Sequence, residues 1–169
     1  FFMEIAKLRA VRMLWAQILE SFGAGEGRRQ AHIHGRTSAF TKTVYDPYVN
    51  LLRNTTQAFS GVVGGIDSLE VSAFDEPIRK SDAFSRRIAR NMQIMMQEEF
   101  ELLQPVDPAG GSWYIETLAL ELADKIWKEF QCIEEKGGID AALQEGYPQT
   151  CVGKSLQERF AALEKRSEV

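Results

Sequence analysis

The chain has 169 residues, enough for one domain, and 44% of them are hydrophobic, which suffices to bury a core. Its formal net charge of -4 provides no basic field for steering nucleic acid, so we expect no nucleic-acid partner. No stretch approaches the roughly 20 apolar residues of a membrane span and no signal peptide is visible, so we expect a soluble, cytoplasmic protein with no membrane partner.

The first segment, from Phe1 to Phe22, is predicted to be an amphipathic helix that ends at the following glycines. The segment lacks an initiator methionine, and its apolar residues are at helical spacing from the first residue onward. We therefore expect the chain to be a piece of a longer polypeptide. The residues expected on its apolar face are Phe1, Ile5, Leu8, Val11, Trp15, Ile18, Leu19 and Phe22.

A strand, a helix and a second strand are predicted next. The first strand fits His32 to Thr37, and the second fits Ile66 to Val71. Asp46 is expected to cap the helix between them, with Pro47 in its first turn. The right-handed crossover rule makes the two strands parallel. Val49, Leu52, Thr56, Phe59 and Val63 are expected on the apolar face of this helix, and Gly61, Gly64 and Gly65 at its end.

Helices dominate the remainder of the chain. Ser81 is expected to cap a helix that runs to about Phe100, in which Met92 and Met95 are interpreted as core residues rather than a binding face. A turn-rich connector follows over 103–112. Three further helices are predicted at Trp113–Lys136, Ile139–Glu145 and Gln149–Arg166, the last with Val152, Leu156, Phe160 and Leu163 on one face.

Two parallel strands cannot form a complete sheet by themselves, because both of their outer edges stay open to pairing. We therefore expect further strands from a covalent or non-covalent partner. The two cysteines, Cys132 and Cys151, are far apart without a CxxC motif, so they indicate neither a zinc site nor a disulfide framework.

Polar residues gather where the two predicted strands end. His34 and Arg36 alternate along one strand and point the same way, so they can bind an anion or a carbonyl group together. Glu76 leaves the second strand at the same edge. Non-functional interpretations remain open: His34 could be a hydrogen-bonded core histidine, and Asp75 and Glu76 could form only a solvated turn. His32 could equally be the residue of this strand that points inward, since it shares a face with His34 and Arg36. No metal-ligand cluster is present, so no metal-binding residue is proposed.

These segments resemble the adenosylcobalamin-dependent acyl-CoA mutases, the methylmalonyl-CoA mutase family. The resemblance covers nearly the whole chain, and its most specific parts are HIHGRTSAF, the FDE turn, FSRRIARNMQ and VDPAGGSWYIE. It implies an α/β, helix-rich fold: the C-terminal portion of a (β/α)8 TIM barrel in residues 1–101, then a helical linker in 102–169 before an absent cobalamin-binding domain.

The resemblance also implies roles for single residues. His34 matches a histidine near the acyl group of the substrate, and Arg36, also assigned to catalysis, stands where the family usually has glutamine. Thr37, Ser38, Ala39 and Glu76 match positions beside the cofactor, with alanine replacing a glycine at Ala39. Pro77 replaces the alanine that usually follows the glutamate.

The implied activity is that of an isomerase, a radical 1,2-rearrangement of an acyl-CoA with adenosylcobalamin as cofactor. The family's Tyr-His segment and its cobalt-ligating Asp-x-His-x-x-Gly motif are absent, so we expect this chain alone to be inactive. Its expected partners are the acyl-CoA substrate, the rest of the barrel with the cobalamin domain, and a second subunit in a homo- or heterodimer. The alternatives are a non-catalytic small subunit and, least favoured, an independent helical interaction domain.

Overall fold

The computed structural model describes residues 1–165. The chain divides into two compact units, and the division falls between Asp124 and Lys125, within a helix. The predicted domain boundary between residues 101 and 102 rests on the resemblance alone and stays a prediction.

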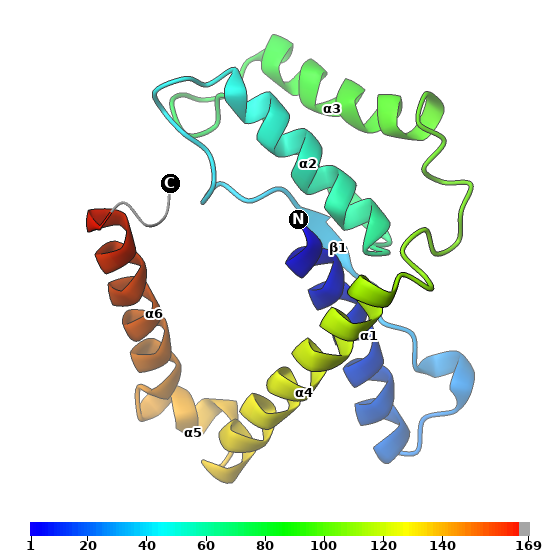
Figure 1. The fold of residues 1–169 in the computed structure, drawn as a ribbon, viewed down its shortest axis with the longest axis vertical. Helices are drawn as coiled ribbons and strands as arrows, with labels where there is room; N and C mark the ends of the chain where they lie inside the picture. Colours follow the sequence, from blue (N-terminus) through cyan, green and yellow to red (C-terminus); the bar gives the residue numbers. More distant parts are fainter. Residues whose placement is uncertain (166–169) are drawn as a thin grey trace. The chain divides into compact units, whose positions relative to one another are not determined.

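The described residues form a helix-rich α/β structure, which confirms the coarser part of the predicted fold class (Figure 1). The connector between the third and fourth helices is irregular, as predicted. In chain order the elements are α1 (Phe2–Ser21), the 3-10 helix η1 (Glu26–Arg28), β1 (His34–Arg36), α2 (Val49–Val63), β2 (Ser68–Glu70), α3 (Ala83–Glu98), α4 (Trp113–Glu135), α5 (Ile139–Gln144) and α6 (Tyr147–Glu164).

The two strands pair in parallel, as predicted, with His34 opposite Ser68 and Arg36 opposite Glu70. Both are shorter than expected. At the first end of β1, the Ile33 amide donates to the Asp67 carboxylate rather than to a strand backbone. The Asp67 side chain therefore takes the place of the next backbone hydrogen bond between the strands, and His32 lies outside β1.

Helix α2 packs against α1, α3 and β2 (Figure 1). Its buried face is not the predicted one, because Leu52 is 68% exposed whereas Asn50 and Asn54 are at most 1% exposed. The core on this side joins α2, the end of β2 and α3 through Ala58, Val71, Ala89, Met92 and Met96. Met92 is therefore a core residue, as predicted.

Two predicted helix caps are wrong. The residue before α2 is Tyr48, and no side chain caps this end, so Asp46 contributes only its backbone carbonyl. Helix α3 is capped by Asp82 rather than Ser81, because Asp82 and Ser85 form a reciprocal capping box.

Helix α1 buries small side chains where the periodicity predicted large ones. Ala6 and Ala10 are fully buried with Ile5, whereas Val11 and Trp15 are 40% and 45% exposed. Helix α1 also crosses α2 closely: a Cβ atom at Gly64, the C-cap of α2, would lie 2.7 Å from Leu8 Cδ1. The absence of a side chain at Gly64 allows this approach.

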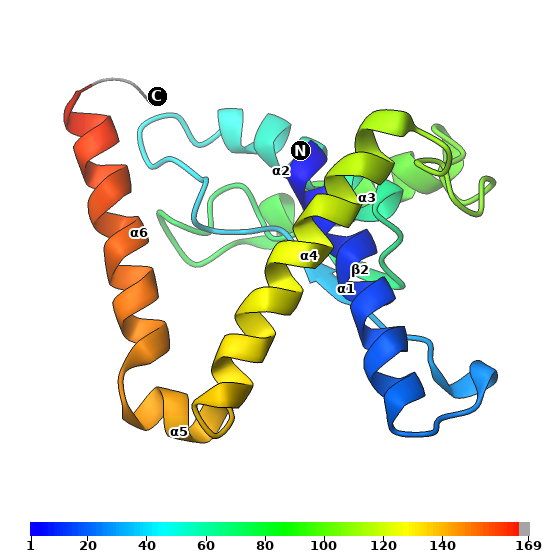
Figure 2. The same cartoon turned by 60° about the horizontal axis from the view of Figure 1, so that its bottom comes forward.

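The second unit contains the end of α4, then α5 and α6 (Figure 2). Gly137 and Gly138 both have positive φ and make the turn after α4, as predicted. The apolar face predicted for α6 is exposed, and Val152 and Phe160 are 67% and 57% exposed. Arg166, the predicted end of this helix, lies outside the described residues.

Candidate functional site

The strand pair presents four polar side chains on the face that points away from the helices. Residues alternate along a strand, so Gly35 and Leu69 point toward the helices while His34, Arg36, Ser68 and Glu70 share the other face. The His34 ring nitrogen Nδ1 lies 2.8 Å from Ser68 Oγ, and Arg36 Nε donates to Glu70 Oε1 at 3.0 Å. The predicted common direction of His34 and Arg36 is confirmed.

Glu76 reaches the same edge from the loop after β2. Its Oε1 accepts from the Arg36 guanidinium at 2.6 Å, which confirms that these two predicted residues meet. Its Oε2 accepts from Lys42 Nζ at 2.8 Å. Both carboxylate oxygens are therefore bound within the chain.

Lys42 is a central residue of this site that the sequence did not reveal. Its side chain is 0% exposed, and its ammonium group also donates to Ser72 Oγ and to the Ala73 carbonyl. A buried ammonium group is stable only when it is paired, and Glu76 is the paired carboxylate. No sequence pattern distinguishes a buried lysine in a polar loop from a solvent-exposed one, so Lys42 could not be singled out from the sequence.

The charges of this cluster shift the pKa values of Glu76 and Arg36 in opposite directions. The hydrogen bond from Lys42 is the largest cause that lowers the pKa of Glu76, and the bond from Arg36 adds to it against the opposing effect of burial. Arg36 is held in turn by Glu70 and Glu76, which raise its pKa. Glu76 is therefore ionised down to acidic pH.

Thr37, which was predicted as the last residue of the strand, follows β1 together with Ser38 and Ala39, and the polar atoms of Thr37 and Ser38 are engaged inside the chain. Thr37 is buried, and its Oγ1 lies 2.7 Å from Ser72 Oγ while accepting from the Ser72 amide at 2.9 Å. The Ser38 amide donates to Gln57 Oε1 at 2.6 Å. The Ser38 hydroxyl accepts a hydrogen bond from the Phe40 amide. Ala39 is exposed.

The two site loops are anchored by asparagines of α2. Asn50 Nδ2 donates to the carbonyls of Thr43 and Phe74, at 2.9 and 3.0 Å, and its Oδ1 accepts from the Thr43 amide. Asn54 Nδ2 donates to the Ser72 carbonyl at 2.8 Å. These bonds tie the loop after β1 to the loop after β2 and fix where Lys42 and Glu76 meet.

A cavity of about 490 Å³ opens beside this cluster, along β1. Its lining includes His34, Arg36, Thr37, Ser38 and Phe40, together with Gln57 of α2. Within residues 1–165, no group of histidine, cysteine or carboxylate side chains could hold a metal ion. The described part of the chain also contains no helix that is long and apolar enough to cross a membrane.

The comparisons with known proteins agree on one family. The methylmalonyl-CoA mutase family profile matches residues 1–169. The methylmalonyl-CoA mutase small subunit of Porphyromonas gingivalis is 42% identical over 171 residues, which cover 100% of this chain and 28% of the relative.

Two further relatives have other printed names. The methylmalonyl-CoA mutase of Cereibacter sphaeroides is 41% identical, and the large subunit of the Porphyromonas gingivalis enzyme is 39% identical. Each alignment covers 99% or more of this chain and 24% of the relative, so the chain spans about a quarter of the length of these curated relatives. The chain belongs to the methylmalonyl-CoA mutase family.

Proposed function

We propose that this chain forms part of the barrel of an adenosylcobalamin-dependent acyl-CoA mutase, an isomerase that rearranges the carbon skeleton of an acyl-CoA thioester. The observation that carries the proposal is the parallel pair β1 and β2, whose ends bring Arg36 and Glu76 within 2.6 Å at one edge. The ends of parallel strands carry the active sites of TIM barrels. The barrel itself is part of the proposal, and its other strands would come from the rest of the protein.

Two roles are possible for this edge. In a catalytic subunit, His34 would donate a hydrogen bond to the thioester carbonyl, Arg36 would hold a carboxylate or polar substituent, and Thr37, Ser38, Ala39 and Glu76 would lie at the cofactor. Adenosylcobalamin would supply the radical chemistry. In a non-catalytic subunit, the same residues would only hold the barrel together.

The charge cluster favours the non-catalytic role. Arg36 and Lys42 occupy both oxygens of Glu76, and the hydroxyl of Thr37 is bound to Ser72. In this arrangement these groups do not fit the adenosyl moiety or corrin ring, because binding either would first break charged hydrogen bonds that stabilise a buried lysine. We therefore propose a small, structural subunit in a heterodimeric mutase, in line with the printed names of the small-subunit relatives.

Replacing His34 with alanine in the intact enzyme decides between the two roles. In the non-catalytic role, kcat for a methylmalonyl-CoA substrate with adenosylcobalamin should stay within about twofold of the wild-type value. In the catalytic role, kcat should fall about tenfold or more, because a hydrogen bond to the reacting carbonyl is lost.

Subunit assembly is the control for this assay. Size-exclusion chromatography of the His34→Ala enzyme must show the wild-type complex, so that a loss of turnover reports on the reaction rather than on assembly. Failure of the intact wild-type heterodimeric enzyme, with both subunits present, to rearrange any branched acyl-CoA in the presence of adenosylcobalamin would contradict the mutase assignment itself. The cytoplasmic location expected from the sequence stays a prediction, which cell fractionation tests.

A further inference from the structure

Two arginines of α3 lie outside the candidate site and carry charges that the described chain does not neutralise. Arg86 and Arg90 are four residues apart, so they share one face of the helix. Both are exposed, and within residues 1–165 neither of them forms an ion pair. The Arg86 guanidinium donates to the Ser81 carbonyl at 2.5 Å, but a neutral carbonyl oxygen does not compensate its charge.

The position of these arginines opposes the helix dipole. The first turn of a helix carries a partial positive charge, which favours acidic side chains there and basic side chains at the other end. Helix α3 has no acidic residue in its first turn and no basic residue in its last turn, and all of its arginines lie in its first half. The dipole therefore does not stabilise Arg86 and Arg90 where they stand, whereas a negative group beside them would.

Both arginines line a cavity of about 310 Å³ beside the end of β2. Val71, Glu70 and Glu76 line the same cavity. Glu70 pairs with Arg36, and Glu76 pairs with Arg36 and Lys42. The two acidic groups of the lining are therefore held by cations other than those of α3, and the cavity leaves room for a further negative group.

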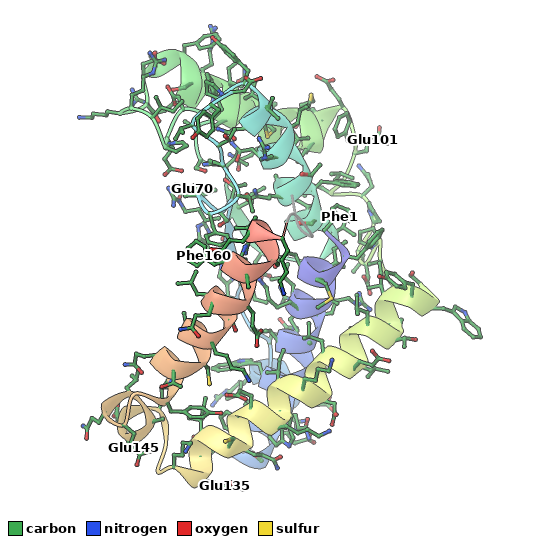
Figure 3. All side chains as sticks on the ribbon, turned by 60° about the vertical axis from the view of Figure 1, so that its left-hand side comes forward. Phe1, Glu70, Glu101, Glu135, Glu145 and Phe160 are labelled. Atoms are coloured by element: carbon green, nitrogen blue, oxygen red, sulfur yellow. The ribbon has the colours of Figure 1, made fainter. Side chains whose placement is uncertain are left out.

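The cavity lies at the open edge of β2. The Ser68 amide and the Glu70 carbonyl both bond toward β1. Bonding directions alternate along a strand, so the amide and carbonyl of Val71 face away from β1. Glu70, labelled in Figure 3, marks this part of β2. A strand that pairs here would bond to those groups, and every second side chain of it would point toward α3.

We propose that Arg86 and Arg90 form a carboxylate-binding pocket, which holds an aspartate or glutamate side chain of the strand that pairs with the open edge of β2. The rest of the protein supplies this strand under the proposed function, on which the pocket depends. A guanidinium group matches a carboxylate with two parallel hydrogen bonds. A free phosphate fits less well, because it would leave the edge of β2 unpaired and would lie beside Glu70 and Glu76.

Zero-length crosslinking of the intact protein tests the pocket. Arg90→Lys keeps the positive charge and supplies an amine, which a carbodiimide joins to a contacting carboxylate as an amide, with loss of one water molecule. Peptide mapping by mass spectrometry should show residue 90 linked to an aspartate or glutamate outside residues 1–169, in a segment of alternating apolar residues. Arg87→Lys is the matched control and should give no such link, because Arg87 lies over the Phe84 ring, 5.6 Å from its centroid.

Several results of this mapping would overturn the proposal. They are linkage of residue 90 to Glu70 or Glu76, linkage to a segment without the alternating pattern, an equal yield at residue 87, and no linkage at residue 90. Sulfate stands in for a free phosphate, because it does not react with the carbodiimide. It should leave the yield at residue 90 equal to that in sodium chloride of the same ionic strength, and protection by sulfate alone would indicate a free-anion site instead. Acyl-CoA turnover is a separate measurement, so each of these results leaves the mutase assignment unchanged.

Discussion

At the residue scale, the buried ammonium group of Lys42 governs the candidate site. It converts Glu76 from a free carboxylate at a strand end into the shared acceptor of two cations. Such a cluster is costly to disturb, because removing one partner leaves a buried charge without compensation. The cost of separating these charges stabilises the cluster, and it also makes the cluster a poor binding site for a new ligand.

Replacing Glu76 with glutamine tests this charge cluster through its pH dependence. The pKa of Glu76 is lowered in the folded protein, so its contribution to stability is present above the ordinary value of 4.5 and is lost as the pH falls through the folded value. At pH about 7, Glu76→Gln should lower the free energy of unfolding of the intact protein by about 1–2 kcal/mol, since the pair is partly screened by solvent. At pH about 3, the difference from wild type should shrink.

Urea unfolding at the two pH values measures this difference. Glu145→Gln is the control, because Glu145 is an exposed residue of the second unit, and its effect should stay within about 0.5 kcal/mol. An equal loss of stability from Glu76→Gln at both pH values would show that shape, rather than charge, accounts for the role of Glu76.

At the element scale, α2 holds the neighbouring loops through hydrogen bonds of buried polar side chains rather than through apolar packing of the predicted face. Asn50 and Asn54 are four residues apart, so they form one buried stripe that holds the loops after both strands. Below them, Ala58 packs in the core, and Ile66 fills the space between Gly35 and Gly61. A Cβ atom at either glycine would lie within 3 Å of Ile66 Cδ1, so the closeness of α2 to β1 depends on both.

Alanine substitutions on the two faces of α2 should separate these interpretations. Asn50→Ala should lower the free energy of unfolding by about 2–3 kcal/mol, because it leaves the Thr43 amide and the Phe74 carbonyl without their partner. Leu52→Ala should cost less than about 1 kcal/mol, because the leucine is 68% exposed. Urea unfolding of the intact protein measures both, and a larger cost for Leu52→Ala would favour the face expected from periodicity.

At the scale of the whole molecule, the described part of the chain has a two-stranded sheet with an open edge on each strand. Large apolar side chains are also exposed, including Phe1, Phe2 and Leu52 on the first unit. Both features are expected of a segment that spans about a quarter of its relatives, because neighbouring strands and helices would cover them.

The chain expressed alone should therefore self-associate. Sedimentation velocity at micromolar concentration should show dimers or larger species, and their proportion should rise with protein concentration. Charged residues placed on an open edge should reduce this association, since charge disfavours edge-to-edge pairing. A compact monomer at every concentration would contradict the expectation and would favour an independent domain.

Local patterns determined much of this protein. Apolar periodicity located the helices, glycine marked the turn after α4, and the crossover rule made β1 and β2 parallel. Strand alternation placed His34 and Arg36 on one face, and chain order brought Glu76 to the same edge. Each of these properties depends on residues close in sequence or on a general rule of chain geometry, so the sequence by itself suffices for them.

Tertiary structure decided which face of each helix is buried and which polar groups meet. Leu52 lies outside and Asn50 inside because the loops facing α2 offer backbone groups that need partners, and periodicity does not record those loops. Lys42 and Glu76 are 34 residues apart, yet they form the central ion pair. Cys132 of α4 lies 3.5 Å from the Tyr147 hydroxyl of α6, 15 residues further along the chain. Such contacts join distant segments, and only packing of the folded chain selects them.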